Sequence, residues 1–548
     1  MKRVLRSVVL AFVVLLLSLS AVSAAGSRPN VINRNEIVGG IGVTPQKAIG
    51  HEPDSGPKFK AGGGVVNVDN YGCKGDGVTD DAPCIRAAYN YGVANYPNGF
   101  TIQGGPTKRY FVDSNTPTHV GCDSAVYFCF PASNVTFKDM YIISGGIGSV
   151  VFENHHEYPW TPMYSMQPVN RGDTTVTLTT ASDASHFAVG DLAFLRGGVY
   201  ANYWNDLIQN KIVAINGSTG VLSFEHAFEK PLNVSTYEPM QIEDVQSATT
   251  FNQTFDHVTI MLGAGDTGSL SQASANIRLE NVDIEQASPT ALNIQFWNEI
   301  YGSHIENSKF VTQNCAANGI SGGDAGSSHG FIEHNEIIQY GCSTHNSAMN
   351  PGEGFEDLHV SNNTVEQLNT GSGTSVGLYI NYSWDVVVSG NTIYVAKITS
   401  RPIASQLGCV NCVFSGNTIY SPIGAPNVFN GQNDQVTGNN FYNAGLDIGG
   451  SPNVTGNTFY YTAAPSYGVI VLENAAAAFF SNITGNTIVN SGSVTGNGIY
   501  VSDPGSPQTY PLTLVANTIT GFTTPIYFAG SASANLTKRV VQGNSGGR

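Results

Sequence analysis

The sequence contains an internal repeat in which a short apolar strand is followed by a small polar pair ending in Asn, and then by another apolar strand. Successive copies of this Asn are separated by 26, 28, 28, 28, 26, 22, 18, 29 and 31 residues. Self-similarity in this range indicates a solenoid or a propeller. The ten copies are Asn281, Asn307, Asn335, Asn363, Asn391, Asn417, Asn439, Asn457, Asn486 and Asn517.

The composition and length of each copy favour the solenoid. The copies carry β-branched runs, such as Val386, Val387 and Val388, between Gly, Asn and Ser turns, without helical periodicity. A propeller blade needs four antiparallel strands and about 40 residues, whereas a coil of three short strands needs fewer. We therefore predict a parallel β-helix, in which equivalent Asn side chains stack about 4.8 Å apart and satisfy one another's buried amides.

The low charge of the chain agrees with an all-β solenoid. Of 548 residues, 62 are Gly and only 12% are charged, which suits frequent tight turns and few long helices. The formal net charge of −16 leaves no basic surface for nucleic acid or an anionic membrane. Any substrate must therefore be recognised by other means.

Residues 1–24 have the features of a secretion signal peptide: three basic residues, an apolar run, and small residues ending near Ala24. Since no second apolar run is long enough for a membrane anchor, we expect a secreted, extracellular protein. Export favours disulfides for the eight cysteines. The spacings suggest Cys73 with Cys84, Cys122 with Cys129, Cys315 with Cys342, and Cys409 with Cys412, the last pair having a zinc half-site as its alternative.

The segment 66–88, VNVDNYGCKGDGVTDDAPCIRAA, leads from a strand through a Gly-rich turn to a helix start. Thr79 or Asp80 can cap a helix that begins near Asp81, with Pro83 in its first turn. The segment resembles the entry motif of the pectate-lyase-like right-handed β-helix superfamily of extracellular glycan-active proteins and phage tailspikes. The resemblance implies a right-handed parallel β-helix whose N-terminal end is covered by a capping α-helix. It also allows a trimer. The motif carries no catalytic residue, so it indicates the fold and not the reaction.

The Asn rhythm lapses between residues 159 and 243. Short runs there look like antiparallel strands with a hairpin turn at 216–220, so we predict a small inserted antiparallel β-subdomain. The aromatic residues Tyr200, Tyr203 and Trp204 either stack on sugar rings or pack the insert onto the helix. The predicted organisation is a signal peptide at 1–24, an N-terminal extension at 25–60, the cap and first coils at 61–158, the insert at 159–243 and the main coils at 244–548.

Two acidic residues come together when the coils are registered on their repeat Asn. Asp324 lies eleven residues before Asn335. Glu353 lies ten residues before Asn363, so the two carboxylates are expected on adjacent coils about 5 Å apart at the backbone. Such a pair suits glycoside hydrolysis, although both residues lie among glycines and could be ordinary turn formers. The side chains expected to point outward beside them and to bind substrate are Asn293, Gln295, Trp297, Tyr379 and Asn381.

A second candidate set is a column of His329, Asp357 and Asp385, each six residues before its repeat Asn. Asp357 could orient His329 as a catalytic base, or the two aspartates could share a Ca²⁺ ion. Glu356, which neighbours this column, is also a catalytic candidate. The alternative is a structural turn column, because other coils place Asn276, Asn411 and Asn433 within one residue of it.

Three functions follow from these patterns. The first is a secreted glycoside hydrolase that acts on a polysaccharide through Asp324 and Glu353, without a cofactor. The second is a polysaccharide lyase or uronate epimerase that uses His329 or Tyr379, with Ca²⁺. The third is a non-catalytic, glycan-binding surface β-helix. The motif set of the usual polygalacturonases is absent from the repeat coils. The middle coils also contain few basic residues, which weakens the lyase hypothesis.

Overall fold

The structure is a computed structural model, and all the residues that it describes belong to one compact unit, Pro53–Arg548. The predicted signal peptide and the whole of the predicted N-terminal extension lie outside the described residues, as do Tyr200, Tyr203 and Trp204 of the predicted insert. The described residues are 63–547 apart from 115–125, 154–161, 199–206, 233–237, 247–248, 288–294, 314–318, 323–327, 341–346, 352–353, 369–374, 398–399, 406–407, 464, 466–467, 474–479, 493–494, 505–510 and 537–538.

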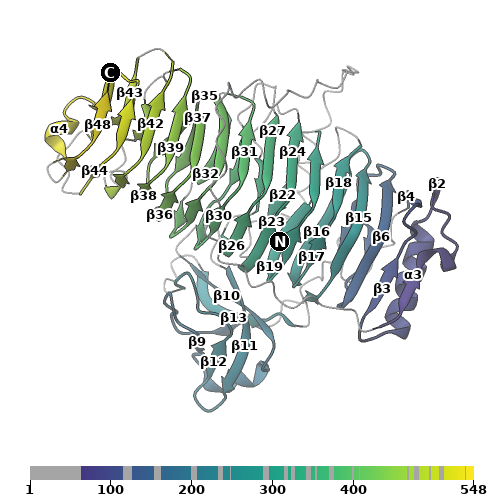
Figure 1. Ribbon diagram of the computed structural model, residues 1–548. Coiled ribbons are helices and arrows are strands. Elements are labelled where there is room, and N and C mark those ends of the chain that lie inside the picture. The colour runs from purple at the N-terminus through teal and green to yellow at the C-terminus, as the bar shows by residue number, and fades with distance from the viewer. Residues whose placement is uncertain are drawn as a thin grey trace, which may run out of the picture. The chain divides into compact units, whose positions relative to one another are not determined.

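The main architecture is a parallel β-helix, as the repeat predicts. Its strands form one continuous 42-stranded sheet in which each coil pairs in parallel with the coils before and after it. For example, β23 (Ser328–Glu333) pairs with β20 (His304–Glu306) on one side and with β26 (Glu356–Ser361) on the other. Figure 1 shows the coils stacked in chain order up to β48 (Ser545–Gly547).

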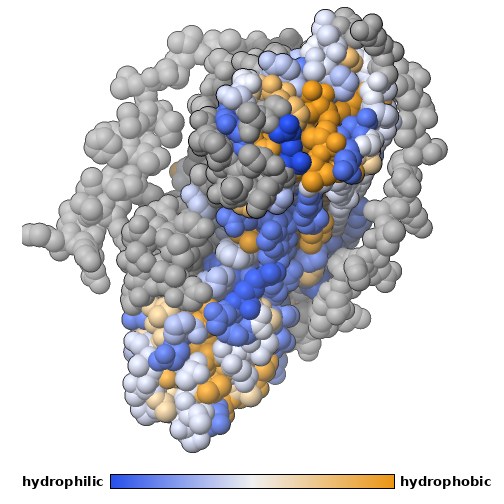
Figure 2. Space-filling view, turned by 90° about the vertical axis from the view of Figure 1, so that its left-hand side faces the viewer, coloured by the Kyte–Doolittle hydropathy of each residue, from blue (hydrophilic) through white to orange (hydrophobic). Residues whose placement is uncertain are grey.

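The interior of the coils is built from columns of aliphatic and aromatic side chains in register. The alternating burial of the strands places every second residue inside. Outside, hydrophilic residues gather in a band across the face shown in Figure 2. One buried column runs through nine successive coils as Ile305, Ile332, Val360, Val388, Phe414, Val436, Val454, Ile483 and Leu514.

A buried ladder of asparagines runs along one turn of the coils. From Asn363 onward, the Oδ1 atom of each ladder Asn accepts from the backbone N–H of the Asn one coil earlier, at 2.9–3.1 Å, and from its Nδ2, at 2.9–3.0 Å. Eight of the ten predicted residues belong to this ladder, and Asn544 adds a further member. The members are Asn335, Asn363, Asn391, Asn417, Asn439, Asn457, Asn486, Asn517 and Asn544.

The prediction was wrong for Asn281 and Asn307, which lie one residue before the ladder. Strand register places Asn307 beside His334, while Ser308 takes the ladder position and donates its backbone N–H to Asn335 at 2.9 Å. Both asparagines adopt left-handed backbone conformations, with φ of 57° and 51°. This position accepts Asn as well as Gly, because Asn tolerates the left-handed region, so an Asn in the repeat can occupy either of the two adjacent positions.

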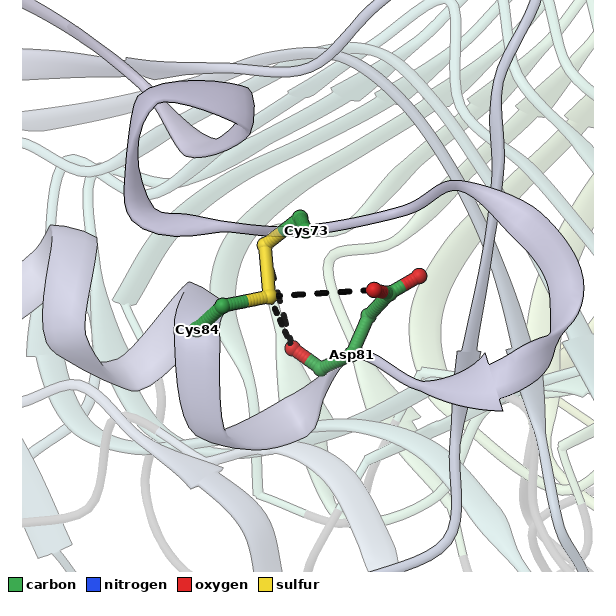
Figure 3. A group of neighbouring side chains, drawn as sticks. All are labelled: Cys73, Asp81 and Cys84. Carbon is green, nitrogen blue, oxygen red and sulfur yellow. Dashed lines mark hydrogen bonds between the residues drawn. A yellow bond between two sulfur atoms is a disulfide. The ribbon is translucent and has the colours of Figure 1, made fainter.

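The N-terminal segment forms β1 (Val65–Asn67), the 3₁₀ helix η1 (Val68–Tyr71) and helix α3 (Ala82–Asn95). Asp80 Oδ1 accepts from the Ala82 N–H at 3.1 Å at the start of α3. The buried Asp81 accepts from the backbone of residues 74 and 75, beside the disulfide of Cys73 and Cys84 (Figure 3). Helix α3 packs against β1 and β3 (Phe100–Gln103), at the N-terminal coils.

The residues between β7 (Val150–Glu153) and β14 (Thr250–Phe251) contain a separate six-stranded sheet whose strands all pair antiparallel (Figure 1). We call this region the insert. It has a hydrophobic core of its own, which includes Leu195, Ile212 and Phe228. Strand β11 contacts β19 (Gln295–Tyr301) and β23 of the β-helix. The strands of the insert are β8 (Tyr164–Ser165), β9 (Thr175–Thr177), β10 (Leu192–Gly198), β11 (Leu207–Asn216), β12 (Val221–Phe224) and β13 (Glu238–Asp244).

The disulfide predictions are confirmed for Cys73 with Cys84 and for Cys409 with Cys412, which excludes the zinc half-site at the second pair. Cys129 is disulfide-bonded as well. The remaining predicted partners, Cys122, Cys315 and Cys342, lie outside the described residues. Neither α3 nor the short α4 (Ala532–Asn535), the α-helices of the described part, has the length and apolar character needed to cross a membrane.

Candidate active site

A column of left-handed residues lines another turn of the β-helix and contains the predicted His329, Asp357 and Asp385. Their φ angles are 57°, 53° and 51° for His329, Asp385 and Asp357 respectively. Asn, Asp and His are the non-glycine residues that tolerate this region best, so the turn itself explains which residue types occur. In chain order the column is Asn134, Asn252, Asn276, Gly302, His329, Asp357, Asp385, Asn411 and Asn433.

The insert covers the part of this column that carries titratable side chains. Phe228, which is fully buried, exchanges two backbone hydrogen bonds with the neighbouring loop: Gly172 N–H donates to its carbonyl and its own N–H donates to Asp173. This pairing places Arg171 and Glu229 side by side. The segment that precedes Phe228 is held by Asn210 of β11. The Asn210 side chain accepts from the backbone N–H of His226 and donates to the His226 carbonyl.

Asp357 bridges two histidines of the β-helix. Its Oδ2 lies 2.7 Å from Nδ1 of His329, and its Oδ1 lies 3.2 Å from Nε2 of His359. Burial by itself raises the pKa of the Asp357 carboxyl, but the hydrogen bonds and charges of the two histidines outweigh it and hold that pKa well below its usual range. An aspartate that binds Nδ1 leaves Nε2 of His329 as a proton acceptor.

Aromatic side chains enclose His329. The ring of His226, from the insert, lies 3.9 Å from that of His329, and the Tyr301 ring meets it edge-on at 5.4 Å. Burial, followed by the closeness of His329, lowers the pKa of His226. Tyr301 donates its hydroxyl to Glu225 at 3.1 Å, and burial and this carboxylate raise its pKa. His329 of β23 therefore lies where the insert contacts the β-helix, with the rings of His226 and Tyr301 against its own ring.

A pair of carboxyl groups lies next along the column. Glu229 and Asp385 both face Arg171, and burial, followed by the closeness of Asp385, raises the pKa of Glu229 to about 6. Arg171 Nη2 lies 2.6 Å from Asp385 Oδ1 and 3.7 Å from Glu229 Oε2. When the side-chain amide of Asn411 is oriented with its oxygen toward Arg171, that oxygen accepts hydrogen bonds from both Nη atoms of Arg171. Both carboxyl groups remain partly open to solvent, with 32% and 21% of the side chains of Glu229 and Asp385 exposed.

Glu356 lies beneath this pair and is almost completely buried. Its Oε1 is 3.8 Å from Nζ of Lys230, which is equally buried. Burial raises the pKa of Glu356 to about 8, and Glu229 and Asp385 add to this effect, while Lys230 opposes it. The protein therefore holds three carboxyl groups and two cationic side chains together where the insert meets the β-helix. Two of the carboxyl groups have raised pKa values, which is typical of acid–base sites.

The structure brings together three of the predicted catalytic residues, His329, Glu356 and Asp357. Asp324 and Glu353 lie outside the described residues, and so does Asn293. For Gln295 and Trp297 the structure describes the backbone, which belongs to β19.

Of the predicted substrate-binding residues, Tyr379 is half-buried at the end of β28 (Val376–Tyr379). The prediction that Asn381 points to solvent was wrong, because this residue is completely buried. The alternation of inward and outward residues ends with β28, and Ile380 and Asn381 are both inside the turn that follows, where the Asn381 carbonyl accepts from Gly354 N–H at 3.1 Å.

The site residues that come from the insert were not predicted. A visible signal is the density of charged and imidazole groups between residues 225 and 230, directly after β12. Their position against the β-helix has no signal, because Arg171 and Asp385 are 214 residues apart in the chain. The site residues that were not predicted are Arg171, Glu225, His226, Glu229 and Lys230 of the insert, together with Tyr301 of β19.

No protein family and no curated protein sequence matches this chain. Among solved structures, the A-module of mannuronan C-5 epimerase AlgE6 from Azotobacter vinelandii is 15% identical, with 88% of this chain and 99% of that chain covered and a TM-score of 0.39. Tailspike protein gp49 from Pseudomonas phage LKA1 is 11% identical over 84% of each chain, with a TM-score of 0.46. PfbA, a surface adhesin of Streptococcus pneumoniae, is 12% identical over 85% of this chain and 91% of that chain, with a TM-score of 0.40. Sequence identities and TM-scores as low as these do not indicate what activity this protein has.

The raised pKa of Glu356 makes stability depend on pH. Because the folded protein binds this proton more tightly than the unfolded chain does, the stabilisation is complete below the ordinary pKa of 4.5 and is lost as the pH rises through about 8. We expect the melting temperature of the wild type to fall more steeply between about pH 5 and pH 8 than that of Glu356→Gln. Thermal unfolding across this range measures the difference, with Glu333→Gln as control. Parallel curves for the wild type and Glu356→Gln would contradict the assignment.

Proposed function

We propose that the protein is a secreted, glycan-acting enzyme, and specifically a glycoside hydrolase whose reaction takes place where the insert meets the β-helix. The observation that carries this proposal is the pair of partly exposed carboxyl groups of Glu229 and Asp385, which both lie beside Arg171, with the pKa of Glu229 raised to about 6. A carboxyl group that keeps its proton near neutral pH, beside a second carboxylate, suits glycosidic bond cleavage.

In this mechanism Glu229 donates its proton to the glycosidic oxygen as the bond from that oxygen to the anomeric carbon breaks. Asp385 faces the positive charge that develops on the sugar ring and assists the water that replaces the leaving group. Arg171 fixes the orientation of both carboxyl groups. No cofactor takes part. The earlier assignment of Asp324 and Glu353 as the carboxylate pair stays a prediction.

A polysaccharide lyase or epimerase is the second candidate, and the bond between His329 and Asp357 favours it. At 2.7 Å, this bond orients the imidazole so that Nε2 can remove a proton from a sugar carbon. A Ca²⁺ ion shared by Asp357 and Asp385 does not fit the residues present. Their oxygens face two histidines and Arg171, which are donors and cations, so we derive no step from calcium.

Incubation with a panel of neutral and uronic polysaccharides tests the proposal. A hydrolase releases new reducing ends without an ultraviolet-absorbing product. An unsaturated, absorbing product would replace the hydrolase by the lyase, and a changed uronate composition in an uncut chain would replace it by the epimerase. A glycan that is bound but chemically unchanged would leave the non-catalytic, glycan-binding function.

A further inference from the structure

A cavity of about 470 Å³ lies between the insert and the β-helix, close to the candidate active site. Its volume is within the range of about 300–1,000 Å³ that is typical of pockets for small ligands. Tyr301, which contacts His329 and donates to Glu225, lines the cavity, and so does Lys211 of β11. Both residues therefore connect the cavity with the His329 end of the site.

One wall of the cavity is a row of asparagine amides from the left-handed column. Nδ2 of Asn276 donates to Oδ1 of Asn252 at 3.1 Å, and Nδ2 of Asn252 donates to Oδ1 of Asn134 at 2.9 Å. Unlike the buried ladder, this row consists of partly or fully exposed residues. It presents amide groups to whatever occupies the cavity.

The amide row ends at Gly302, which takes the next position of the column. A Cβ atom on Gly302 would lie 2.8 Å from Oδ1 of Asn276, so a side chain at this position would cover that oxygen. Among the described residues, Oδ1 of Asn276 has no hydrogen-bond donor. The glycine thus leaves an acceptor open beside the cavity, where a hydroxyl group can donate to it.

A second part of the cavity lining is apolar. Leu192 and Ala275 are buried and belong with Tyr301 to a small hydrophobic cluster, against which the partly buried Phe251 packs. A lining that combines an apolar surface with a row of amides matches a sugar ring, whose faces are apolar and whose edges carry hydroxyl groups.

The lining carries little net charge. Among the described residues that line the cavity, Lys211 carries the one charged side chain. Its Nζ lies 3.9 Å from a carboxylate oxygen of Glu225. This pairing offsets the positive charge, so the cavity offers no strong attraction to an anionic ligand. Its donors and acceptors instead favour a ligand that is recognised through neutral hydroxyl groups.

We propose that the cavity is a saccharide subsite that binds an uncharged sugar unit of the glycan through the amides of Asn252 and Asn276. The inference rests on the proposed function only in that the ligand is a glycan, since binding in the cavity does not require cleavage. It assigns the cavity to the part of the substrate that extends from the carboxyl pair past Tyr301.

Isothermal titration of the full chain with short neutral gluco-, manno-, xylo- and galacto-oligosaccharides tests the subsite. Asn252→Gly and Asn276→Gly each remove one amide, and glycine tolerates the left-handed backbone, as Gly302 does in the same column. Each substitution is expected to weaken binding of the retained oligosaccharide by roughly threefold to tenfold, the value of one or two neutral hydrogen bonds. Asn433→Gly is the matched control, because Asn433 has the same backbone conformation and does not line the cavity.

The outcomes separate the subsite from the proposed chemistry. Binding that is weakened in both cavity variants, but unchanged in Asn433→Gly, supports the subsite even if no glycan is cleaved. Wild-type affinity in both cavity variants would overturn it, and so would retention of acidic oligosaccharides alone. Melting temperatures of the variants, compared with the control, show whether a loss of binding reflects unfolding; should one variant fail to fold, the other decides.

Discussion

Asn391→Ala is expected to destabilise the protein by about 3–5 kcal/mol. Asn391 Oδ1 accepts from the backbone N–H of Asn363 at 2.9 Å and from its Nδ2 at 3.0 Å. Its own Nδ2 donates to the Val360 carbonyl at 2.8 Å. The substitution therefore leaves several polar groups unsatisfied in the interior, where each costs about 1–3 kcal/mol.

The measurement is the urea midpoint of unfolding together with hydrogen exchange of the Asn363 amide. Because the coils of a solenoid contact only their neighbours, exchange should increase most in the coils adjoining the substitution. Asn482→Ala is the control, since Asn482 donates to Asn453 at 2.8 Å in an exposed pair and is expected to cost less than about 0.5 kcal/mol. Equal effects of the two substitutions would show that the ladder does not stabilise the coils.

Glu229→Gln is expected to lower kcat/KM on the cleaved glycan by about 10²- to 10⁴-fold, the usual contribution of a positioned acid. Glutamine keeps the shape of the side chain but has no proton to give to the leaving oxygen. In the wild type, activity should fall as the pH rises through about 6, because Glu229 then loses its proton. Release of reducing ends, measured across this pH range, tests both expectations.

Glu333→Gln provides the matched control for Glu229→Gln. Glu333 accepts from the Ser361 hydroxyl at 2.7 Å at the end of β23, next to the turn that carries the buried ladder, and it is not part of the candidate site. Its substitution should leave kcat/KM unchanged. If Glu229→Gln retained full activity with an unaltered melting temperature, the carboxyl pair would not be the catalytic acid site.

The fold was predictable because its repeat is visible in one dimension. A residue that recurs at each coil and satisfies its own copies leaves a periodic trace, and eight of the ten asparagines in that trace form the ladder. The errors at Asn281 and Asn307 have a physical origin. Two adjacent turn positions accept Asn for different reasons, one for hydrogen bonding and one for its backbone conformation.

The candidate site was predictable only on its β-helix side. His329, Asp357 and Glu356 follow from coil register, because register converts sequence separation into position. Arg171 and Glu229 do not, since the backbone bonds of Phe228 within the insert, and not the repeat, bring them to the column. Substrate contacts inferred from strand alternation fail where the strand ends, as Asn381 shows.

The coils between consecutive ladder asparagines contain from 18 to 31 residues, yet the ladder bonds stay the same. The ladder turn thus acts as a fixed spine, and differences in coil length are confined to the rest of each coil. Such a division gives the chain evolutionary freedom, because a loop can be lengthened, shortened or exchanged without disturbing the spine. Under the proposed function, new glycan contacts can therefore be introduced by grafting loops onto these coils while the ladder is left unchanged.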